Sequence, residues 1–234
     1  MFNRDYFERE FKTEDPWSYN TSTSEHAKYL KQIDLTKLLV PEPRAILEIG
    51  CAEGIHTRML ALAFPQARIV AVDISPTAVA RARQRCRRYS NVVFVDGDIN
   101  LLLKRSVLPH HRYDVILQSE SLYYMFLNHC IRFRLVGYVL ALLNRLTPGG
   151  VFITCNSYSG VTRTVVSVYY GIFKLLSEPV YIKCEKIWYE SRGAFWNCEI
   201  KAYRTRRKIA PTPVVDKIVD RSNNNKLTEK KSRQ

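Results

Sequence analysis

The chain has 234 residues, of which 46% are hydrophobic, and a formal net charge of +14. This length fits one ordinary domain and can bury a substantial apolar core without disulfides or metals. Residues 1–15 are dense in charge and lack the apolar run of a secretory signal, and no stretch reaches the roughly 18 apolar residues of a membrane span. The composition argues against a secreted or membrane-spanning protein, so we expect a cytoplasmic one.

Cysteine spacing and charge distribution exclude two further classes. The six cysteines form no C-x-x-C pair and have no histidine at zinc-binding spacing, so we expect reduced thiols and no metal site. The positive charge is unevenly placed, because residues 201–234 contain eleven basic and three acidic residues. More than half of the net charge belongs to this terminal stretch, and the remaining body is only mildly basic.

Five apolar, β-branched runs recur along the chain at the spacing of strand-helix units. They are residues 45–50, 68–73, 92–98, 113–120 and 150–157. The segments between them predict helices over 54–64, 76–89 and 130–146. Ser75 and Pro76 supply an N-cap and a first helical residue for the second of these. This alternation predicts a doubly wound α/β fold with a parallel sheet.

The chain continues past the fifth strand with three further segments. Residues 161–176 are strongly apolar and predict a helix that covers the sheet or lines a pocket. Residues 181–190 and 194–204 are aromatic-rich runs around Gly193, which predict an antiparallel β-hairpin and complete a mainly parallel, seven-stranded sheet. The polar and basic composition of residues 208–234 cannot bury enough apolar surface to fold, so we expect a disordered tail.

The first strand ends in a turn that suits a ligand site. Gly50 and Gly54 flank this turn, and the small Ala52 lies between them. Ligands of open α/β sheets bind beyond the carboxyl ends of the strands, where glycines let backbone N–H groups approach them. Because Ala and Ile occupy positions 52 and 55, the spacing departs from G-x-G-x-x-G and disfavours a pyrophosphate-binding dehydrogenase.

Acidic residues near the ends of the first three strands indicate which charges and hydrogen-bonding groups the ligand carries. Glu48 suits ammonium and sulfonium charges and would repel a pyrophosphate, although a glutamate that braces the turn is an alternative. Asp73, followed by Ile74, ends the second strand, where a carboxylate can accept hydrogen bonds from both ribose hydroxyls. Asp98, followed by Ile99, can hold an adenine amino group and cover its ring, with Asp96 as the second candidate and helix capping by Asp98 as the alternative.

The order and spacing of these motifs over residues 44–157 resemble the class I S-adenosylmethionine-dependent methyltransferases. Three further segments resemble the nodulation N-methyltransferase (NodS-like) family. They are DPWSY at 15–19, EHAKY at 25–29 and SESLYY at 119–124. This resemblance covers most of the chain to about residue 120.

The resemblance implies a Rossmann-like methyltransferase fold, S-adenosyl-L-methionine as cofactor, and methylation of an amine. In the best-known case the amine belongs to a glucosamine at the end of a chito-oligosaccharide. The resemblance also implies an N-terminal helical cap, residues 1–40, on a methyltransferase domain, residues 41–207. Trp17 would pack near the cofactor and Lys28 would face its carboxylate. A tryptophan that completes the core and a solvated lysine are the alternatives.

The end of the fourth strand is where we expect the reaction. Methyl transfer is an in-line displacement that needs neither a metal nor a covalent intermediate, so the protein must mainly align the nucleophile and exclude water. An amine must be neutral to attack, so a nearby carboxylate could take its proton, and Glu120 lies where such a group belongs. Ser119, beside it, would contact the cofactor.

Two other functions compete with methylation of a small-molecule or oligosaccharide amine. The basic tail and an arginine-rich helix suit an RNA or other nucleic-acid methyltransferase. These arginines are Arg81, Arg83, Arg85, Arg87 and Arg88. A solvated helix face explains them more simply, and the fourth strand lacks the Asn/Asp-Pro-Pro-Tyr/Phe motif of base-amine methyltransferases. The other competitor is a non-catalytic binding protein on a methyltransferase fold.

Overall fold

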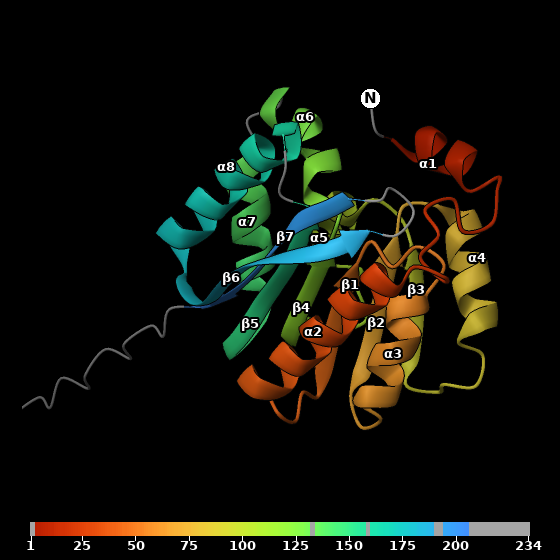
Figure 1. The fold of residues 1–234 in the computed structure, drawn as a ribbon. Coiled ribbons are helices and arrows are strands. Elements are labelled where there is room, and N and C mark those ends of the chain that lie inside the picture. The colour runs from red at the N-terminus through yellow and green to blue at the C-terminus, as the bar shows by residue number, and fades with distance from the viewer. Residues whose placement is uncertain (1–2, 132–133, 158–159, 190–193, 206–234) are drawn as a thin grey trace, which may run out of the picture.

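The computed structural model describes residues 3–131, 134–157, 160–189 and 194–205. Seven strands form one sheet in the order β3-β2-β1-β4-β5-β7-β6 (Figure 1). Their bounds are β1 Ala45–Ile49, β2 Arg68–Asp73, β3 Val92–Asp96, β4 Tyr113–Ser119, β5 Leu146–Ser157, β6 Glu178–Tyr189 and β7 Ala194–Arg204. Strands β1 to β5 pair in parallel, and β7 pairs antiparallel with both β5 and β6.

The strand order reverses beside β1. The chain moves outward from β1 to β2 and β3, and then returns to the other side of β1 with β4. Two connections that leave neighbouring strands in opposite directions open a crevice beyond the carboxyl ends of those strands. The topology therefore places the ligand crevice at the ends of β1 and β4.

Helices connect the strands and flank the sheet (Figure 1). Their bounds are α1 Arg4–Glu10, α2 Thr23–Leu39, α3 Ile55–Ala63, α4 Pro76–Arg85, α5 Ile99–Arg105, α6 Leu122–Ile131, α7 Leu135–Asn144 and α8 Gly160–Leu176. Side-chain caps begin several of them. Ser22 accepts a hydrogen bond from the Glu25 backbone N–H, and Ser75 accepts one from that of Ala78, with Pro76 in the first turn of α4.

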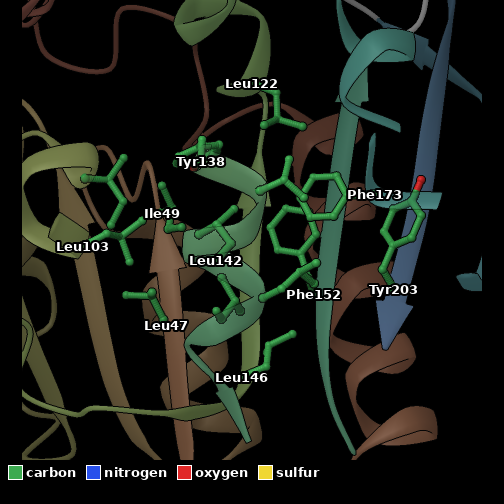
Figure 2. Close-up of a cluster of buried hydrophobic side chains, with 14 of the residues drawn as sticks. Leu47, Ile49, Leu103, Leu122, Tyr138, Leu142, Leu146, Phe152, Phe173 and Tyr203 are labelled. Carbon is green, nitrogen blue, oxygen red and sulfur yellow. The ribbon is translucent and has the colours of Figure 1, made fainter. Parts of the chain in front are cut away.

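The sheet is covered by apolar clusters on both faces. Ile46 of β1 packs with residues of α2 and α3, whereas the next residue, Leu47, packs with residues of α5, α7 and α8. Successive side chains of a strand point to opposite faces, so the two clusters lie on opposite sides of the sheet. Figure 2 shows part of the second cluster, where the ring of Phe152 stacks on that of Phe173 with centroids 4.5 Å apart. Each such side chain contributes about 1.5–3 kcal/mol by leaving water.

Most of the predicted elements are confirmed. The five parallel strands begin or end within a few residues of their predicted positions, the hairpin is β6 and β7, and the apolar run at 161–176 is helix α8. The predicted single helix over 130–146 is wrong, because this stretch contributes to two helices, α6 and α7, and β5 already begins at Leu146. Leu146 pairs with Tyr113 of β4, and the register then shifts before Val151.

Some predictions fall outside the described residues. The hairpin turn at 190–193 and the tail at 208–234 are among them. Within the described part of the chain, no helix is both long enough and apolar enough to cross a membrane. Cys51, Cys86, Cys155 and Cys198 are buried free thiols.

Candidate active site

A pocket opens beyond the carboxyl ends of β1, β2 and β4. Its lining contains all of the predicted site residues except Gly54. They are Trp17, Lys28, Glu48, Gly50, Ala52, Asp73, Ile74, Asp98, Ile99, Ser119 and Glu120. The structure therefore gathers residues from positions 17 to 120 at the strand-order reversal.

The turn after β1 adopts left-handed backbone conformations. Gly50, Ala52 and Gly54 have φ of 80°, 46° and 78°, a region that glycine reaches freely and alanine does not. The backbone N–H of Ala52 donates to Asp73 Oδ2 over 2.8 Å, which helps to hold this conformation. Gly54 instead faces α4, where an added Cβ would lie 2.9 Å from Ala82 Cβ. Its role is close helix packing, which explains its absence from the pocket lining.

Asp73 ends β2 as a buried carboxylate with backbone partners. Its Oδ1 accepts from the Ser75 N–H over 3.0 Å, and its Oδ2 accepts from Ala52. Burial raises the pKa of Asp73 to about 6, although these backbone N–H groups oppose the shift. Each carboxylate oxygen retains a second lone pair that can accept another hydrogen bond.

Glu48 lines the pocket and is also held by polar contacts with two residues of helix α3. Thr57 Oγ1 donates to Glu48 Oε2 over 2.5 Å, and His56 Nδ1 lies 3.0 Å from Glu48 Oε1. The imidazole of His56 stacks on Tyr29 of α2 with ring centroids 4.6 Å apart. The sequence interpretation missed His56 and Tyr29, because their positions, in the first turn of α3 and in the predicted N-terminal cap, gave no local signal of this contact.

Asp98 caps a helix and also lines the pocket. It is the N-cap of α5, where its Oδ1 accepts from the Asn100 backbone N–H over 2.8 Å, and it also lines the pocket with Ile99. A capping aspartate uses one oxygen for the helix and can present the other to a ligand.

Helix α2 presents a buried polar stripe to the same pocket. Glu25, Lys28 and Gln32 follow one another at spacings of three and four residues, which places them on one helix face. Gln32 Oε1 accepts from Ser119 Oγ over 2.6 Å. Lys28 Nζ lies 2.7 Å from Glu25 Oε1 and donates to Glu120 Oε1 over 2.7 Å. The sequence interpretation missed Glu25 and Gln32, although their spacing from Lys28 could have indicated them.

Glu120 is fixed at the end of β4 by several contacts. Its Oε2 accepts from the Ser157 backbone N–H over 3.0 Å and from Tyr123 Oη over 3.2 Å, and Ser157 Oγ donates to Oε1. Its backbone has a φ of 47°, which is uncommon for a residue with a side chain. Burial raises the pKa of Glu120, but the Lys28 ammonium and the hydrogen bonds from Lys28 and Ser157 bring it below its ordinary value.

A cluster of aromatic side chains, most of them from the N-terminal segment, forms another side of the pocket. Trp17 packs against Phe11 and Tyr19, with ring centroids 5.1 and 5.7 Å apart, and Phe7 meets Tyr124 of α6 at 5.3 Å. All five of these residues line the pocket. Trp17 is thus half-buried between the N-terminal segment and the cavity.

Polar contacts attach this segment to α4. Glu8 of α1 accepts hydrogen bonds from Ser75 Oγ and Thr77 Oγ1. Glu53 accepts from the Asp15 backbone N–H over 3.2 Å and from Arg81 Nη1 over 2.6 Å. Because buried Glu53 joins the glycine turn to both segments, the wall formed by residues 3–21 is tied to the ligand turn itself.

The fold defines the class. The structure of this chain is similar to that of the solved N-methyltransferase NodS from Bradyrhizobium japonicum WM9 in complex with S-adenosyl-L-homocysteine. The TM-score is 0.68 at 23% identity, over 87% of this chain and 98% of that one. The fold is therefore that of the Rossmann-like methyltransferases.

The family follows from the sequence comparison. The model of the family Nodulation protein S (NodS) matches residues 2–170, so the chain belongs to the NodS family. The chain is 32% identical to Nodulation protein S of Bradyrhizobium diazoefficiens over 53% of this chain and 55% of that one. The protein of that name from Sinorhizobium fredii is also 32% identical, over 50% of each chain. The chain thus matches about half the length of these two relatives.

Proposed function

We propose that this protein is an S-adenosylmethionine-dependent methyltransferase that N-methylates an amino group of a sugar, an oligosaccharide or another small molecule. The observation that carries this proposal is the acidic pocket at the strand-order reversal of a NodS-family chain. Six carboxyl side chains line it, whereas Lys28 is the one lysine or arginine among the described lining residues. The chain is strongly basic overall, whereas this pocket is acidic, and an acidic pocket suits cationic ligands.

The residues at the ends of β1, β2 and β3 fit this cofactor. The free lone pairs of Asp73 suit ribose hydroxyls, and Asp98 and Ile99 suit an adenine amino group and ring. Gly50 lines the pocket and has no side chain of its own, so a ligand can approach its backbone. The negative charge of Glu48 suits a ligand that carries positive charges. Ala52 and Ile74 complete this wall.

The remaining residues would align the acceptor and exclude water. The bound cofactor supplies a methyl group activated by a sulfonium. Trp17 and the N-terminal wall cover the pocket, and we propose that residues 1–40 act as the cap of a methyltransferase domain at 41–207. Ser119 would contact the cofactor. Lys28 is already paired with Glu25 and Glu120, and Glu120, in its ionised form, would take the proton of the acceptor amine.

An oligosaccharide amine is the acceptor that we favour. The solved relative is named an N-methyltransferase, and an ammonium is the form in which a sugar amine would enter an acidic pocket. Tyr19 and Tyr124 line the pocket together with Glu120, and aromatic side chains of this kind suit packing against a sugar ring.

Incubation with labelled S-adenosylmethionine tests this function. A chito-oligosaccharide with a free terminal amine should take up label, whereas the same oligosaccharide with that amine acetylated should not. Calorimetry should also detect binding of S-adenosylhomocysteine to the wild-type protein. Absence of cofactor binding would leave a non-catalytic binding protein as the better explanation.

The arginine-rich helix offers little support for nucleic-acid binding. Arg81 and Arg85 are engaged with Glu53, and Arg83 donates to the Phe94 backbone carbonyl over 3.0 Å. Arg81 and Arg85 are thus committed to contacts within the protein, and the acidic pocket would repel a phosphate backbone. Label that entered RNA but no amine would overturn our choice of acceptor.

A further inference from the structure

Lys28 lies between two carboxylates at the inner end of the pocket. Its Nζ is 2.7 Å from Glu25 Oε1 and 2.7 Å from Glu120 Oε1. The side chains of Lys28 and Glu25 are 2% and 3% exposed, and that of Glu120 is 11% exposed. Glu25 and Lys28 belong to one turn of α2, whereas Glu120 follows β4, so the bridge joins the N-terminal helix to the end of the sheet.

Because the three side chains are buried, their charges must compensate one another. An ionised side chain removed from water is costly unless an opposite charge and hydrogen bonds compensate it. One ammonium here serves two carboxylates, so the bridge retains a net negative charge that faces the pocket. The loss of Lys28 would remove the ammonium that these two carboxylates share.

The other hydrogen bonds of Glu120 fix the orientation of its carboxylate. The Ser157 N–H and Oγ donate to the two carboxylate oxygens, and Tyr123 Oη donates to Oε2. With Lys28 on Oε1, both oxygens have donors, and the backbone φ of 47° further limits where the side chain can go. Glu120 is thereby immobilised as an acceptor of hydrogen bonds at the pocket wall.

We propose that Lys28 is a positioning residue for the acceptor side, which keeps the Glu120 carboxylate ionised and fixed at the pocket wall that the acceptor amine would approach. This inference rests on the proposed function and gives Lys28 a role distinct from contact with the cofactor carboxylate. In this role the acceptor ammonium meets an anionic carboxylate, which favours an amine over a neutral hydroxyl as the group selected.

The electrostatics around Glu120 support this role. Apart from Lys28, the titratable groups that face it carry negative charge or none. They are Tyr19 of the N-terminal segment, Glu25 of α2, Tyr123 and Tyr124 of α6, and Cys198 of β7. Burial alone raises the pKa of Glu120, and the Lys28 ammonium is the largest influence that lowers it. Without Lys28 the carboxyl group would be protonated at higher pH.

The test is a titration of Glu120 in the full chain, which requires no acceptor. The Glu120 carboxyl carbon is followed by NMR in protein labelled with ¹³C-glutamate and assigned with Glu120→Gln. In Lys28→Met the apparent pKa of Glu120 should rise by about 1–3 pH units, because an opposite charge at this distance has an effect of that size. Lys28→Arg should restore the wild-type titration, and Lys37→Met, an exposed site on the same helix, should not alter it.

Calorimetry with S-adenosylhomocysteine separates the two roles of Lys28. We expect the affinity of Lys28→Met to stay within about threefold of wild type. With the free-amine oligosaccharide, the acid limb of kcat/KM should move upward with the Glu120 titration. An unchanged titration, or an affinity loss of about tenfold or more without a titration shift, overturns the proposal. Should Lys28→Met fail to fold, Lys28→Gln at the same position provides the titration.

If the wild type binds no S-adenosylhomocysteine, the proposed function fails, and the titration still decides whether Lys28 controls Glu120. If cofactor binding and methylation succeed while the titration is unchanged, only the positioning role fails.

Discussion

The two halves of the pocket are built in different ways. The half at the ends of β1 and β2 comes from one continuous strand-turn-helix-strand unit, in which Ala52 and Asp73 are 21 residues apart. The half at the end of β4 depends on Lys28 and Glu120, which are 92 residues apart and belong to elements that no short motif connects. In the first half, a backbone hydrogen bond from Ala52 helps to hold Asp73 in place. In the second half, the buried ion pair with Lys28 holds Glu120 in place.

This difference predicts how each half responds to substitution. Removal of a group from the first half should affect cofactor binding or folding. Removal of a charge from the second half should affect protonation and the acceptor. Four predictions concern the two halves and the contacts that support them.

The largest effect is expected where backbone conformation and packing coincide. Gly54→Ala requires a φ of 78° and places Cβ 2.9 Å from Ala82 Cβ, so we expect a loss of about 2–5 kcal/mol in the free energy of unfolding. Gly149→Ala is the matched control, because its φ is 85° and nothing lies within 4 Å of the added Cβ. It should cost about 1–2 kcal/mol. Denaturant titrations measure both, and equal losses would contradict the packing role of Gly54.

Cofactor affinity separates the two halves directly. Asp73→Ala removes the acceptor at the end of β2, and we expect it to weaken S-adenosylhomocysteine binding by about 100-fold, since hydrogen bonds to a charged group contribute about 1.5–3 kcal/mol each. Glu120→Gln should change the affinity by less than about threefold. Calorimetry on both variants is the measurement. A similar loss in the two variants would show that the halves do not act separately.

The pH dependence of cofactor binding should come from Asp73. Burial raises its pKa from 3.8 to about 6 in the folded protein, so the free protein binds a proton there below pH 6. Donation from ribose hydroxyls favours the ionised form, and binding then releases that proton. Affinity should therefore increase about tenfold from pH 5 to pH 7. In Asp73→Ala, calorimetry across this range should find the slope reduced.

The smallest effect concerns the arginines of α4. Arg81 pairs with buried Glu53 at 2.6 Å, whereas Arg83 lies 3.7 Å from Asp96 with both side chains exposed. Arg81→Ala should cost about 1 kcal/mol of unfolding free energy, and Arg83→Ala less than about 0.5 kcal/mol. Thermal and denaturant unfolding can resolve this difference. Equal effects would mean that Arg81 does not anchor the N-terminal segment.

The sequence predicted the sheet because its strands are buried, β-branched runs separated by clear helix signals. It failed at 130–146, where a mainly apolar composition does not reveal that two helices, α6 and α7, contribute to the stretch. It also missed helix α5, although Asp98 was recognised as a possible cap. Apolar periodicity indicates what is buried, and tertiary packing decides where the helices end.

Local sequence determined the turn at Gly50, the carboxylate at Asp73 and the capping position of Asp98, because neighbouring residues in one strand-turn-helix unit fix them. Only the tertiary structure decided that Lys28 of α2 meets Glu120 at the end of β4. These charges must be paired because they are buried. Which partner each one finds depends on how α2 packs against the sheet, and a linear pattern does not contain that information.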